Sequence, residues 1–448
     1  MHLIIIGAGP GGYETALKAA QRGLEVTLIS GGPLGGTCLN EGCIPTKALR
    51  RSADVADLVA ESGQYGIHAG EPSLDMGAVM ERKEKIVSEL RTGIEFLMKK
   101  AKVTVLRGKA SFVDNRTVCV SLEDGGEQTV TGDAILIATG SVSASLPIPG
   151  ADLCIDSARM LSLPEVPGRL CVIGAGVIGL EFASIFRSFG SEVSVLEYCR
   201  EILPRFDTDL SKRLKQSLSR KGIAIETAAC VQRVEKTPDG LLLVTYVKKD
   251  QSQTVLCDTV LMAVGRRPAV GSLNFGDIGI ETTPRGVVVD KDFQTSVPGI
   301  YAVGDIIGGY MLAHVATFQG LHALNHLTGV ADAIDFSVVP AAVFTSPEAA
   351  TVGLSEDECK DKGIAVKCLK SNFRANGKAL TMGETDGFCK VVTAAEDGRL
   401  LGCHLFGPHA ADLIHEMAAL IARGVTLQTF RDLIHAHPTL SEVLPAAL

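Results

Sequence analysis

The sequence predicts an α/β fold with two nucleotide-binding units, followed by a separate α+β domain. An apolar strand runs into a glycine-rich turn and a helical pattern at residues 3–22, and the same arrangement returns at residues 170–189. From about residue 335 this pattern stops, and alternating strand patterns mix with a helix-like segment at 410–423. The chain has 448 residues, of which 46% are hydrophobic, which suits a globular protein of roughly three domains.

The first unit opens with an apolar strand at residues 3–6, which leads into Gly7, Gly9 and Gly12 and ends with a second strand at 25–30. In a dinucleotide-binding turn the first glycine permits the tight turn, the second lets a pyrophosphate approach the backbone, and the third lets the helix pack on the strand. The helix N-terminus then neutralises the phosphates. Residues 3–30 therefore predict a Rossmann-like unit.

The second unit repeats this order from a strand at 170–173, through Gly174, Gly176 and Gly179, to a strand at 192–197. Each glycine fingerprint stands between an expected strand and an expected helix, which is the context that the motif requires. Two dinucleotide-binding units are therefore expected in one chain.

The two units differ at the end of their second strand. Glu197 stands where an acid hydrogen-bonds a ribose 2′-hydroxyl and repels a 2′-phosphate, which favours NAD over NADP. Ser30 holds the same place in the first unit and can bond a ribose without adding charge. Arg200 lies three residues beyond Glu197 and could meet a 2′-phosphate, which leaves some use of NADP open.

Three later segments also read as apolar strands that end sharply, at 134–140, 259–268 and 299–305. Asp305 is the last residue of the third segment. Its carboxylate could bind a ribityl or ribose hydroxyl, or it could cap the N-terminus of the next helix. Both interpretations stay open. Residues 1–145 are expected to form the first domain, which residues 269–334 complete. Residues 146–268 are expected to form the second domain, and residues 335–448 the C-terminal domain.

Cys38 and Cys43 follow the first unit, separated by four residues. In a regular helix such a pair would point ~140° apart with Cα atoms ~8.6 Å apart, which is too far for a disulfide. The backbone must therefore deform if they bond, and Gly42 and Pro45 permit this. Lys47 would lie on the face of Cys43, where its charge favours a thiolate. Two unrelated structural thiols remain the alternative.

His437 and Glu442 close the chain with an acid–base pattern, because a carboxylate can fix the tautomer of a histidine and stabilise its cation. A histidine before proline can also be a simple turn residue. The pairs His435/His437 and His322/His326 have ligand-like spacing but no matching cysteine or acidic set, so no metal site is expected.

The composition excludes several classes of function. A net charge of −8 and the absence of tryptophan argue against nucleic acid as a partner. No run reaches the ~18 apolar residues of a membrane span, so no membrane association is expected. The N-terminus shows no export signal, and twelve cysteines in so long a chain suggest reduced thiols and a cytoplasmic location.

The whole pattern resembles the flavin-dependent pyridine nucleotide-disulfide oxidoreductases over nearly the whole chain. The segments 35–49 (GGTCLNEGCIPTKAL) and 435–442 (HAHPTLSE) carry the resemblance, and residues 174–181, 265–268, 304–305 and 311–314 support it. The resemblance implies a homodimer whose first unit binds FAD, whose second binds NAD, and whose C-terminal dimerisation domain completes the partner's active site.

The resemblance also implies residue roles. Cys43 is the thiol nearest the flavin and makes the charge-transfer contact, and Cys38 exchanges with the substrate. His437 of the partner subunit, oriented by Glu442, takes and returns the proton. Lys47 would pair with Glu181, and Asp305 would hold the ribityl chain. The implied FAD contacts are Gly7, Gly9, Gly12, Ser30, Thr37, Lys47, Gly140, Asp305 and Ala313. The implied NAD contacts are Gly174, Gly176, Gly179, Glu181, Glu197 and Gly265.

The implied reaction is the oxidation of dihydrolipoamide on the lipoyl domain of a 2-oxoacid dehydrogenase or glycine-cleavage complex, with NAD as acceptor. Ser30 departs from the acid usual in the family, which predicts weaker FAD binding. Two other hypotheses stay open: an NADPH-dependent disulfide or metal-ion reductase of the same superfamily, and a non-catalytic scaffold or redox-sensing subunit.

Overall fold

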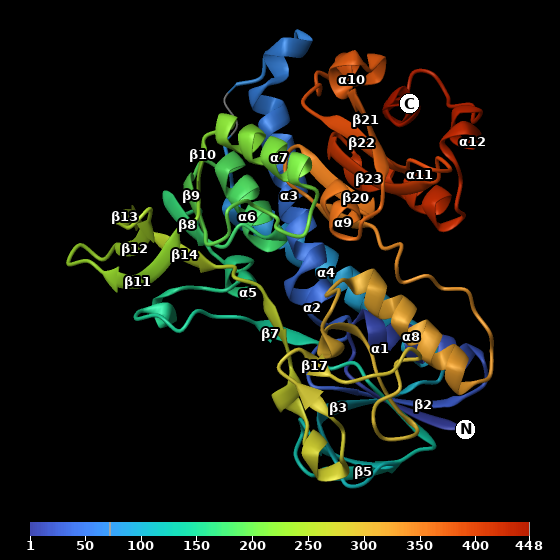
Figure 1. The fold of residues 1–448 in the computed structure, drawn as a ribbon. Helices are drawn as coiled ribbons and strands as arrows, with labels where there is room; N and C mark the ends of the chain where they lie inside the picture. Colours follow the sequence, from blue (N-terminus) through green and yellow to red (C-terminus); the bar gives the residue numbers. More distant parts are fainter. Residues whose placement is uncertain (71–72, 448) are drawn as a thin grey trace. The chain divides into compact units, whose positions relative to one another are not determined.

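A computed structural model describes residues 1–70 and 73–447. The chain forms two compact units (Figure 1). Unit 1 contains residues 1–48, 78–144 and 266–334, and unit 2 contains residues 49–77, 145–265 and 335–448. Among the helices of the described residues, none has the length and apolar character that a membrane crossing requires.

Unit 1 is built on a sheet with the strand order β18-β6-β1-β2-β3, extended by β4 and β5. The first five strands pair in parallel, and the last two pair antiparallel. Strand β1 lies between β2 and β6, so the chain crosses over in opposite directions from β1, and ligands bind at the carboxyl ends of strands at such a point. The strands are β1 (His2–Ile6), β2 (Glu25–Ser30), β3 (Thr104–Phe112), β4 (Thr117–Leu122), β5 (Glu127–Thr131), β6 (Ala134–Ile137) and β18 (Ile300–Ala302).

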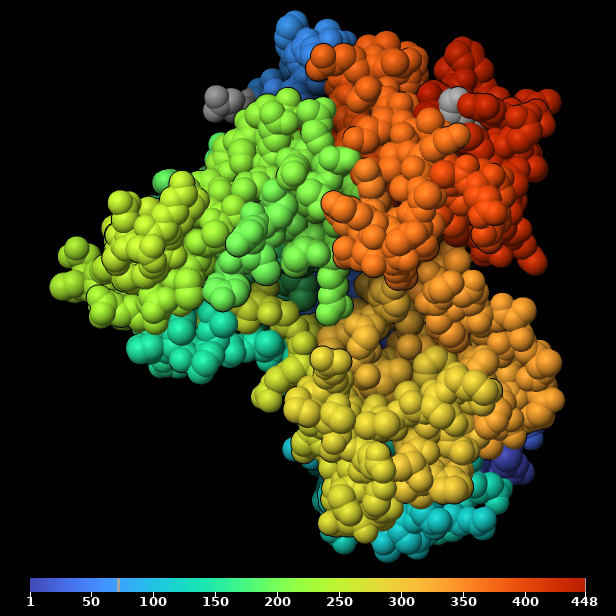
Figure 2. Space-filling model, in the orientation of Figure 1, coloured from blue at the N-terminus to red at the C-terminus, as the bar shows by residue number. Residues whose placement is uncertain are grey.

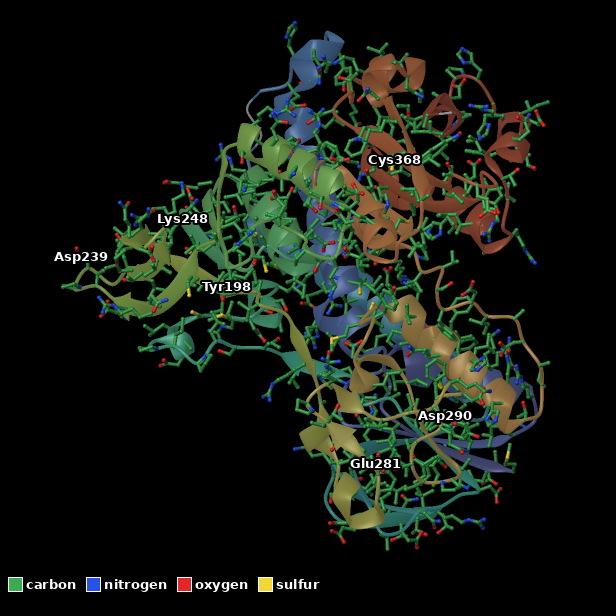
Figure 3. All side chains as sticks on the ribbon, in the orientation of Figure 1. Tyr198, Asp239, Lys248, Glu281, Asp290 and Cys368 are labelled. Atoms are coloured by element: carbon green, nitrogen blue, oxygen red, sulfur yellow. The ribbon has the colours of Figure 1, made fainter. Side chains whose placement is uncertain are left out.

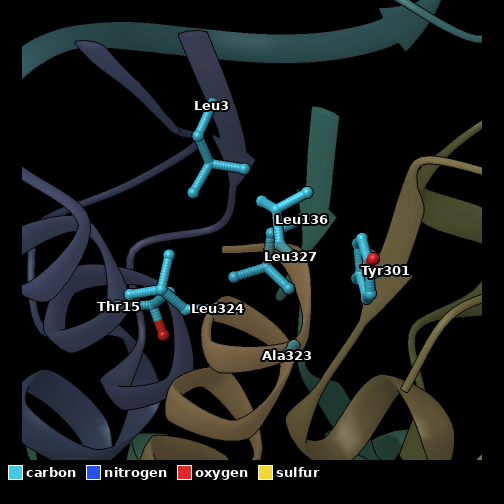
Figure 4. Close-up of a pocket in the computed structure, with 7 residues that line it drawn as sticks. All are labelled: Leu3, Thr15, Leu136, Tyr301, Ala323, Leu324 and Leu327. Carbon is cyan, nitrogen blue, oxygen red and sulfur yellow. The ribbon is translucent and has the colours of Figure 1, made fainter. Parts of the chain in front are cut away.

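Two helices pack together on one face of this sheet, α1 (Pro10–Gln21) and α8 (Ala313–Leu327). Figure 4 shows side chains of β1, β6 and β18 turned toward these helices around a small pocket. Its lining residues are Leu3, Thr15, Leu136, Tyr301, Ala323, Leu324 and Leu327. This apolar layer fixes the N-termini of both helices at the carboxyl ends of the strands.

The rest of unit 1 includes two short strand pairs and the long helix α4 (Met76–Lys100), except for the first two residues of that helix. Strand β7 (Ser141–Ser143) pairs with β15 (Arg266–Pro268), and β16 (Thr282–Thr283) pairs with β17 (Gly286–Val287). The β7–β15 pair joins two segments of unit 1 that lie far apart in the sequence.

Unit 2 begins with a second parallel sheet, in the order β10-β9-β8-β14. The run β8–α6–β9 repeats the run β1–α1–β2, so the internal repeat predicted from the sequence is a repeat of structure. An antiparallel sheet β11-β12-β13 follows. The elements are α5 (Ser157–Met160), β8 (Arg169–Ile173), α6 (Val177–Ser188), β9 (Glu192–Glu197), α7 (Thr208–Arg220), β10 (Ile223–Thr227), β11 (Cys230–Lys236), β12 (Leu242–Lys248), β13 (Gln251–Cys257) and β14 (Thr259–Met262).

The C-terminal part of unit 2 is an antiparallel sheet in the order β19-β20-β23-β22-β21, with α11 packed on β20 and β23. This is the α+β domain that the sequence predicts. Its elements are β19 (Ala341–Val343), β20 (Glu348–Gly353), α9 (Glu356–Asp361), β21 (Val366–Asn372), α10 (Gly377–Met382), β22 (Phe388–Ala394), β23 (Leu400–Gly407), α11 (Ala410–Ala422) and α12 (Leu427–Arg431).

A buried lysine joins the two parts of unit 2. Lys390, on β22, is 2% exposed, and its Nζ lies 2.9 Å from Asp207 Oδ2, 2.8 Å from Asp209 Oδ2 and 2.7 Å from Glu356 Oε2. Asp207 also caps the N-terminus of α7. The side chains of α7 (green) meet those of the C-terminal sheet domain (orange) in Figure 2. One cation therefore links a helix of the second nucleotide-binding unit to the C-terminal sheet.

Lys390→Met should lower the free energy of unfolding by ~3–5 kcal/mol, because removing one partner of a buried ion pair leaves an uncompensated charge. The side chain of Asp207 is 0% exposed, so water cannot replace the cation. Guanidinium unfolding followed by circular dichroism measures the loss. Lys370→Met is the matched control, since Lys370 pairs with Asp209 at the surface and such pairs contribute ~0–1 kcal/mol. Equal losses in the two variants would contradict the prediction.

Candidate active site

The glycine turn of unit 1 has the geometry of a phosphate-binding site. Gly7 has a φ of +109°, and a Cβ on Gly12 would overlap the carbonyl oxygen of Gly7. A Cβ on Gly9 would meet nothing within 4 Å, so the backbone there is open to a ligand. Helix α1 begins directly after Gly9 and points its N-terminus at this space. The three glycines thus have the conformations that the fingerprint requires.

The other residues predicted to contact FAD in unit 1 stand along the same edge of the sheet. Ser30 ends β2 and is buried, and its hydroxyl donates to the carbonyl of Gly32 at 2.6 Å. Gly140 follows β6 with a φ of +72°. Ala313 is the first residue of α8. The hydroxyl proton of Ser30 is thus already used within the protein, and only its lone pairs remain for a ribose.

Asp305 lies in the short 3-10 helix Gly304–Ile307, which follows β18. Its carboxylate accepts a hydrogen bond from Ser141 Oγ at 2.5 Å, and the same Oγ accepts one from Arg266 Nε at 2.7 Å. The N-caps of the nearby helices are Val303 and Leu312, so Asp305 is not an N-cap. Sequence reasoning missed Ser141 and Arg266, although it noted the strand ends beside them.

Two observations, besides the open turn at Gly9, show that the residues at this edge of the sheet fit a flavin dinucleotide. Thr139 Oγ1 is buried and has no hydrogen-bond partner within the described part of the chain. A buried hydroxyl of this kind calls for a ligand or water. Ser30, Gly140 and Asp305 also end neighbouring strands of the sheet around β1, where an adenosine, a pyrophosphate and a ribityl chain can follow one another.

The two cysteines lie at a break between two helices. Helix α2 (Gly36–Glu41) ends at Gly42, whose φ of −145° and ψ of −112° are not helical, and α3 (Cys43–Ala60) begins at the next residue. A Cβ on Gly42 would lie 2.9 Å from the carbonyl oxygen of Thr37. The Thr46 hydroxyl donates to the Gly42 carbonyl at 2.6 Å. The backbone deformation expected from the cysteine spacing is therefore present at the expected glycine.

This break brings the two sulfur atoms together. The thiols of Cys38 and Cys43 form a hydrogen bond, and both residues are half-buried. That hydrogen bond and burial raise the pKa of Cys38, and the nearby Lys47 ammonium opposes the rise. Cys38 is thus a protonated thiol in the dithiol form, and it needs a base to become a nucleophile.

The cysteine segment packs directly on the glycine turn. The Gly35 amide donates to the carbonyl of Ala8 at 2.9 Å, and a Cβ on Gly36 would lie 2.6 Å from the Cα of Gly9. Thr37 follows as an exposed residue at the start of α2. A dinucleotide on the turn of Gly9 and the thiols of Cys38 and Cys43 would therefore share one site in unit 1.

Unit 2 repeats the phosphate-binding geometry. Gly174 has a φ of +106°, a Cβ on Gly179 would overlap the Gly174 carbonyl oxygen, and a Cβ on Gly176 would meet nothing within 4 Å. Gly265 follows β14 with a φ of +112°. Glu181, in α6, is buried and accepts a hydrogen bond from the Phe344 amide at 3.0 Å. The open backbone at Gly176 fits a second dinucleotide.

Glu197 ends β9 and is buried. Its Oε2 accepts from the Ala175 amide at 2.6 Å, and its Oε1 accepts from the Cys199 amide at 2.7 Å. The carboxylate thus braces the glycine turn and keeps further lone pairs for a ribose hydroxyl. Tyr198 is 75% exposed beside it, and Figure 3 shows its side chain. Arg200 is also exposed.

The C-terminal histidine is held by its predicted partner. His437 Nδ1 lies 2.9 Å from Glu442 Oε1, and Glu442 Oε2 accepts from the Thr439 amide at 2.8 Å. The Thr439 amide and the His437 ring lower the pKa of Glu442. The His437 side chain is 77% exposed, so Nε2 can meet another molecule. His435 differs, because it is mostly buried against Glu416.

Within the described residues, no cluster of three or more histidines, cysteines and acidic residues is placed to hold a metal ion. The candidate groups are the open glycine turn and the thiol pair of unit 1 and, in unit 2, a second open glycine turn and a carboxylate-held imidazole. Such groups can transfer protons and exchange disulfides beside a bound nucleotide.

Comparison with known proteins agrees with this geometry. The family model for pyridine nucleotide-disulphide oxidoreductase matches residues 1–320, and the model for the dimerisation domain of the same family matches residues 339–448. The dihydrolipoyl dehydrogenase of Geobacillus stearothermophilus is 42% identical over 442 residues, which cover 98% of this chain and 94% of that protein. The mitochondrial dihydrolipoyl dehydrogenase of Pisum sativum is 39% identical over 451 residues, covering 99% and 90%.

A solved structure extends the similarity to the fold. The HOCl-induced flavoprotein disulfide reductase RclA from Escherichia coli is 30% identical and superposes with a TM-score of 0.89. The match covers 100% of this chain and 99% of that one.

Proposed function

Because the chain belongs to the pyridine nucleotide-disulphide oxidoreductases, a family of enzymes, we propose that it oxidises protein-bound dihydrolipoamide to lipoamide with NAD as acceptor. The observation that carries the proposal is the thiol pair of Cys38 and Cys43 at a helix break, packed on an open dinucleotide turn. The identity of 42% to a dihydrolipoyl dehydrogenase over 98% of the chain supports this substrate.

The cysteine pair performs the exchange. A thiolate of dihydrolipoamide attacks Cys38 of the Cys38–Cys43 disulfide, so that a mixed disulfide forms and Cys43 leaves as a thiolate. The second substrate thiol then attacks the mixed disulfide, which releases lipoamide and leaves Cys38 as a thiol. Two electrons thus move from the substrate to the cysteine pair. FAD, when bound, would supply the two-electron redox chemistry that links the cysteine pair to NAD.

His437 of the partner subunit acts as the base in this proposal. Dihydrolipoamide thiols must lose a proton before they attack, and the imidazole accepts it at Nε2. Glu442 holds Nδ1 and stabilises the imidazolium that results. The raised pKa of Cys38 requires the same base in the reverse direction, when Cys38 attacks lipoamide.

The cofactor contacts follow the two units. Gly9, Ser30, Gly140 and Asp305, in residues 1–145 and 269–334, would hold FAD. Gly176, Glu197 and Gly265, in residues 146–268, would hold NAD. In this proposal Lys47 lies near the flavin and pairs with Glu181.

The dimerisation domain of residues 339–448 supports a homodimer whose active sites each take His437 from the partner. The macromolecular partner is the lipoyl domain of a 2-oxoacid dehydrogenase or glycine-cleavage complex. We also infer a cytoplasmic location, because twelve cysteines in a chain of 448 residues are far fewer than a secreted disulfide scaffold of this length would carry.

Lipoamide-dependent oxidation of NADH by the purified flavoprotein tests the proposal. Rapid oxidation with lipoamide and little with glutathione disulfide or Cu(II) is the expected result. Rapid reduction of glutathione disulfide or Cu(II) with slow lipoamide turnover would instead assign the chain to the reductases of the same family. A protein that binds FAD but reduces none of these would be a non-catalytic subunit.

Glu197→Gln should lower kcat/KM for NADH by about 10–100-fold, because a hydrogen bond to a charged group contributes ~1.5–3 kcal/mol. The change also removes the charge that repels a 2′-phosphate, so the ratio of NADH to NADPH activity should fall. Steady-state rates with both coenzymes measure this. Arg200→Ala is the control, and a strong loss of NADPH activity there would show that Arg200 binds the 2′-phosphate.

A further inference from the structure

Asn40 anchors the short helix that carries Cys38. Its side-chain amide donates to the carbonyl of Leu34 at 3.0 Å and to the carbonyl of Gly36 at 2.9 Å. Helix α2 has six residues, and a helix of that length is not stable by itself. The position of Cys38, between Gly36 and Asn40, therefore depends on anchors outside the helix.

Helix α4 supplies such an anchor. Arg91 Nε donates to Asn40 Oδ1 at 3.0 Å, across 51 residues of sequence, and both side chains are half-buried. Arg82 of the same helix donates from Nη1 to the carbonyl of Ala48, in α3, at 3.0 Å. Helix α4 thus holds both helices that carry the cysteines, α2 through Arg91 and α3 through Arg82.

We propose that Arg91 is a positioning residue that, through Asn40, sets the redox equilibrium of the Cys38–Cys43 pair. The inference rests on the proposed function only in taking this pair as the redox couple. We assign Arg91 a positioning role because it contacts the cysteine helix through its hydrogen bond to Asn40. It acts by holding α2 so that the two sulfur atoms stay together.

The direction of the effect follows from chain entropy. Closing a disulfide is easier when both thiols are held close to each other, whereas the open dithiol does not need this alignment. Loosening α2 therefore disfavours the disulfide more than the dithiol. Loss of the Arg91–Asn40 hydrogen bond should make the pair more easily reduced.

The test equilibrates the intact flavoprotein with mixtures of reduced and oxidised dithiothreitol, without NAD. In each exchange the protein disulfide gains two electrons and two protons, and dithiothreitol loses them and closes to its cyclic disulfide. Acid quenching, alkylation and mass spectrometry of the peptide with Cys38 and Cys43 give the fraction reduced. Arg91→Met should shift the equilibrium three- to tenfold toward the dithiol, or about 14–30 mV at 29.6 mV per tenfold.

A double-mutant comparison separates positioning from charge. Asn40→Leu should shift the equilibrium at least as far, and adding Arg91→Met to it should cause no further shift. Arg91→Lys, which keeps a donor, should recover at least half of the loss. Lys85→Met removes a charge from an exposed position of α4 and should leave the equilibrium unchanged.

Three outcomes would overturn the inference: a shift below twofold in Arg91→Met, an equal shift in Lys85→Met, or additive shifts in the double variant. The measurement needs no lipoamide turnover. If the protein shows these shifts but does not oxidise dihydrolipoamide, the proposed substrate is wrong and the role of Arg91 still holds.

Discussion

Cys38→Ser should reduce lipoamide-dependent NADH oxidation by a factor of about 10³ or more, because a hydroxyl cannot form the mixed disulfide that the exchange requires. Electron transfer from NADH to an artificial dye should persist, since that route needs the nucleotide sites and not the cysteine pair. The variant should also keep its flavin, because the glycine turn at Gly9 is untouched. Stopped assays with lipoamide and with a dye, on the same preparation, measure both rates.

Cys119→Ser is the matched control. Cys119 is half-buried in β4 of the same unit, outside the glycine turn and the cysteine loop. Both activities should survive in this variant. Lipoamide turnover that persists in Cys38→Ser at more than a tenth of the normal rate would refute the role of Cys38 as the exchanging thiol.

His437→Gln should lower the rate with dihydrolipoamide by about 10²–10⁴, the usual contribution of a general base. Glutamine keeps the size and a polar group near Glu442, but it cannot take a proton. The loss should shrink as the pH rises toward the pKa of the substrate thiols, because dihydrolipoamide then supplies its own thiolate. The rate measured from pH 6 to pH 9 tests this. His409→Gln changes an exposed histidine and should leave the profile unchanged.

Mixed dimers test whether the base comes from the partner subunit. When Cys38→Ser and His437→Gln chains are co-expressed, about half of the dimers are hybrids, and one of the two sites in each hybrid is intact. The mixture should then recover about a quarter of the normal activity. Recovery near zero would place His437 and Cys38 of one site in the same chain.

Local spacing was enough to predict the parts of the site that lie close together in sequence. The glycine fingerprints gave the strands around Gly7 and Gly174, and the geometry of a regular helix required a break between Cys38 and Cys43, which lies at Gly42. Helix α1 begins at Pro10, because proline suits the first turn of a helix.

Contacts between distant segments could not be predicted in this way. Arg91 meets Asn40 across 51 residues, and Lys390 meets Asp207 across 183. The hydrophobic periodicity of the sequence does not predict such pairs, because lysine, arginine, aspartate and asparagine are usually surface residues. The Asp305 carboxylate is similar, because its partner Ser141 comes from another strand end.

The buried lysine of β22 also limits how the molecule can be divided. A fragment cut out to contain only the second nucleotide-binding segment would lose the Lys390 ammonium that pairs with Asp207. Dissection by domain truncation is therefore unsuited to this half of the protein, and its coenzyme site is best studied with the C-terminal sheet attached.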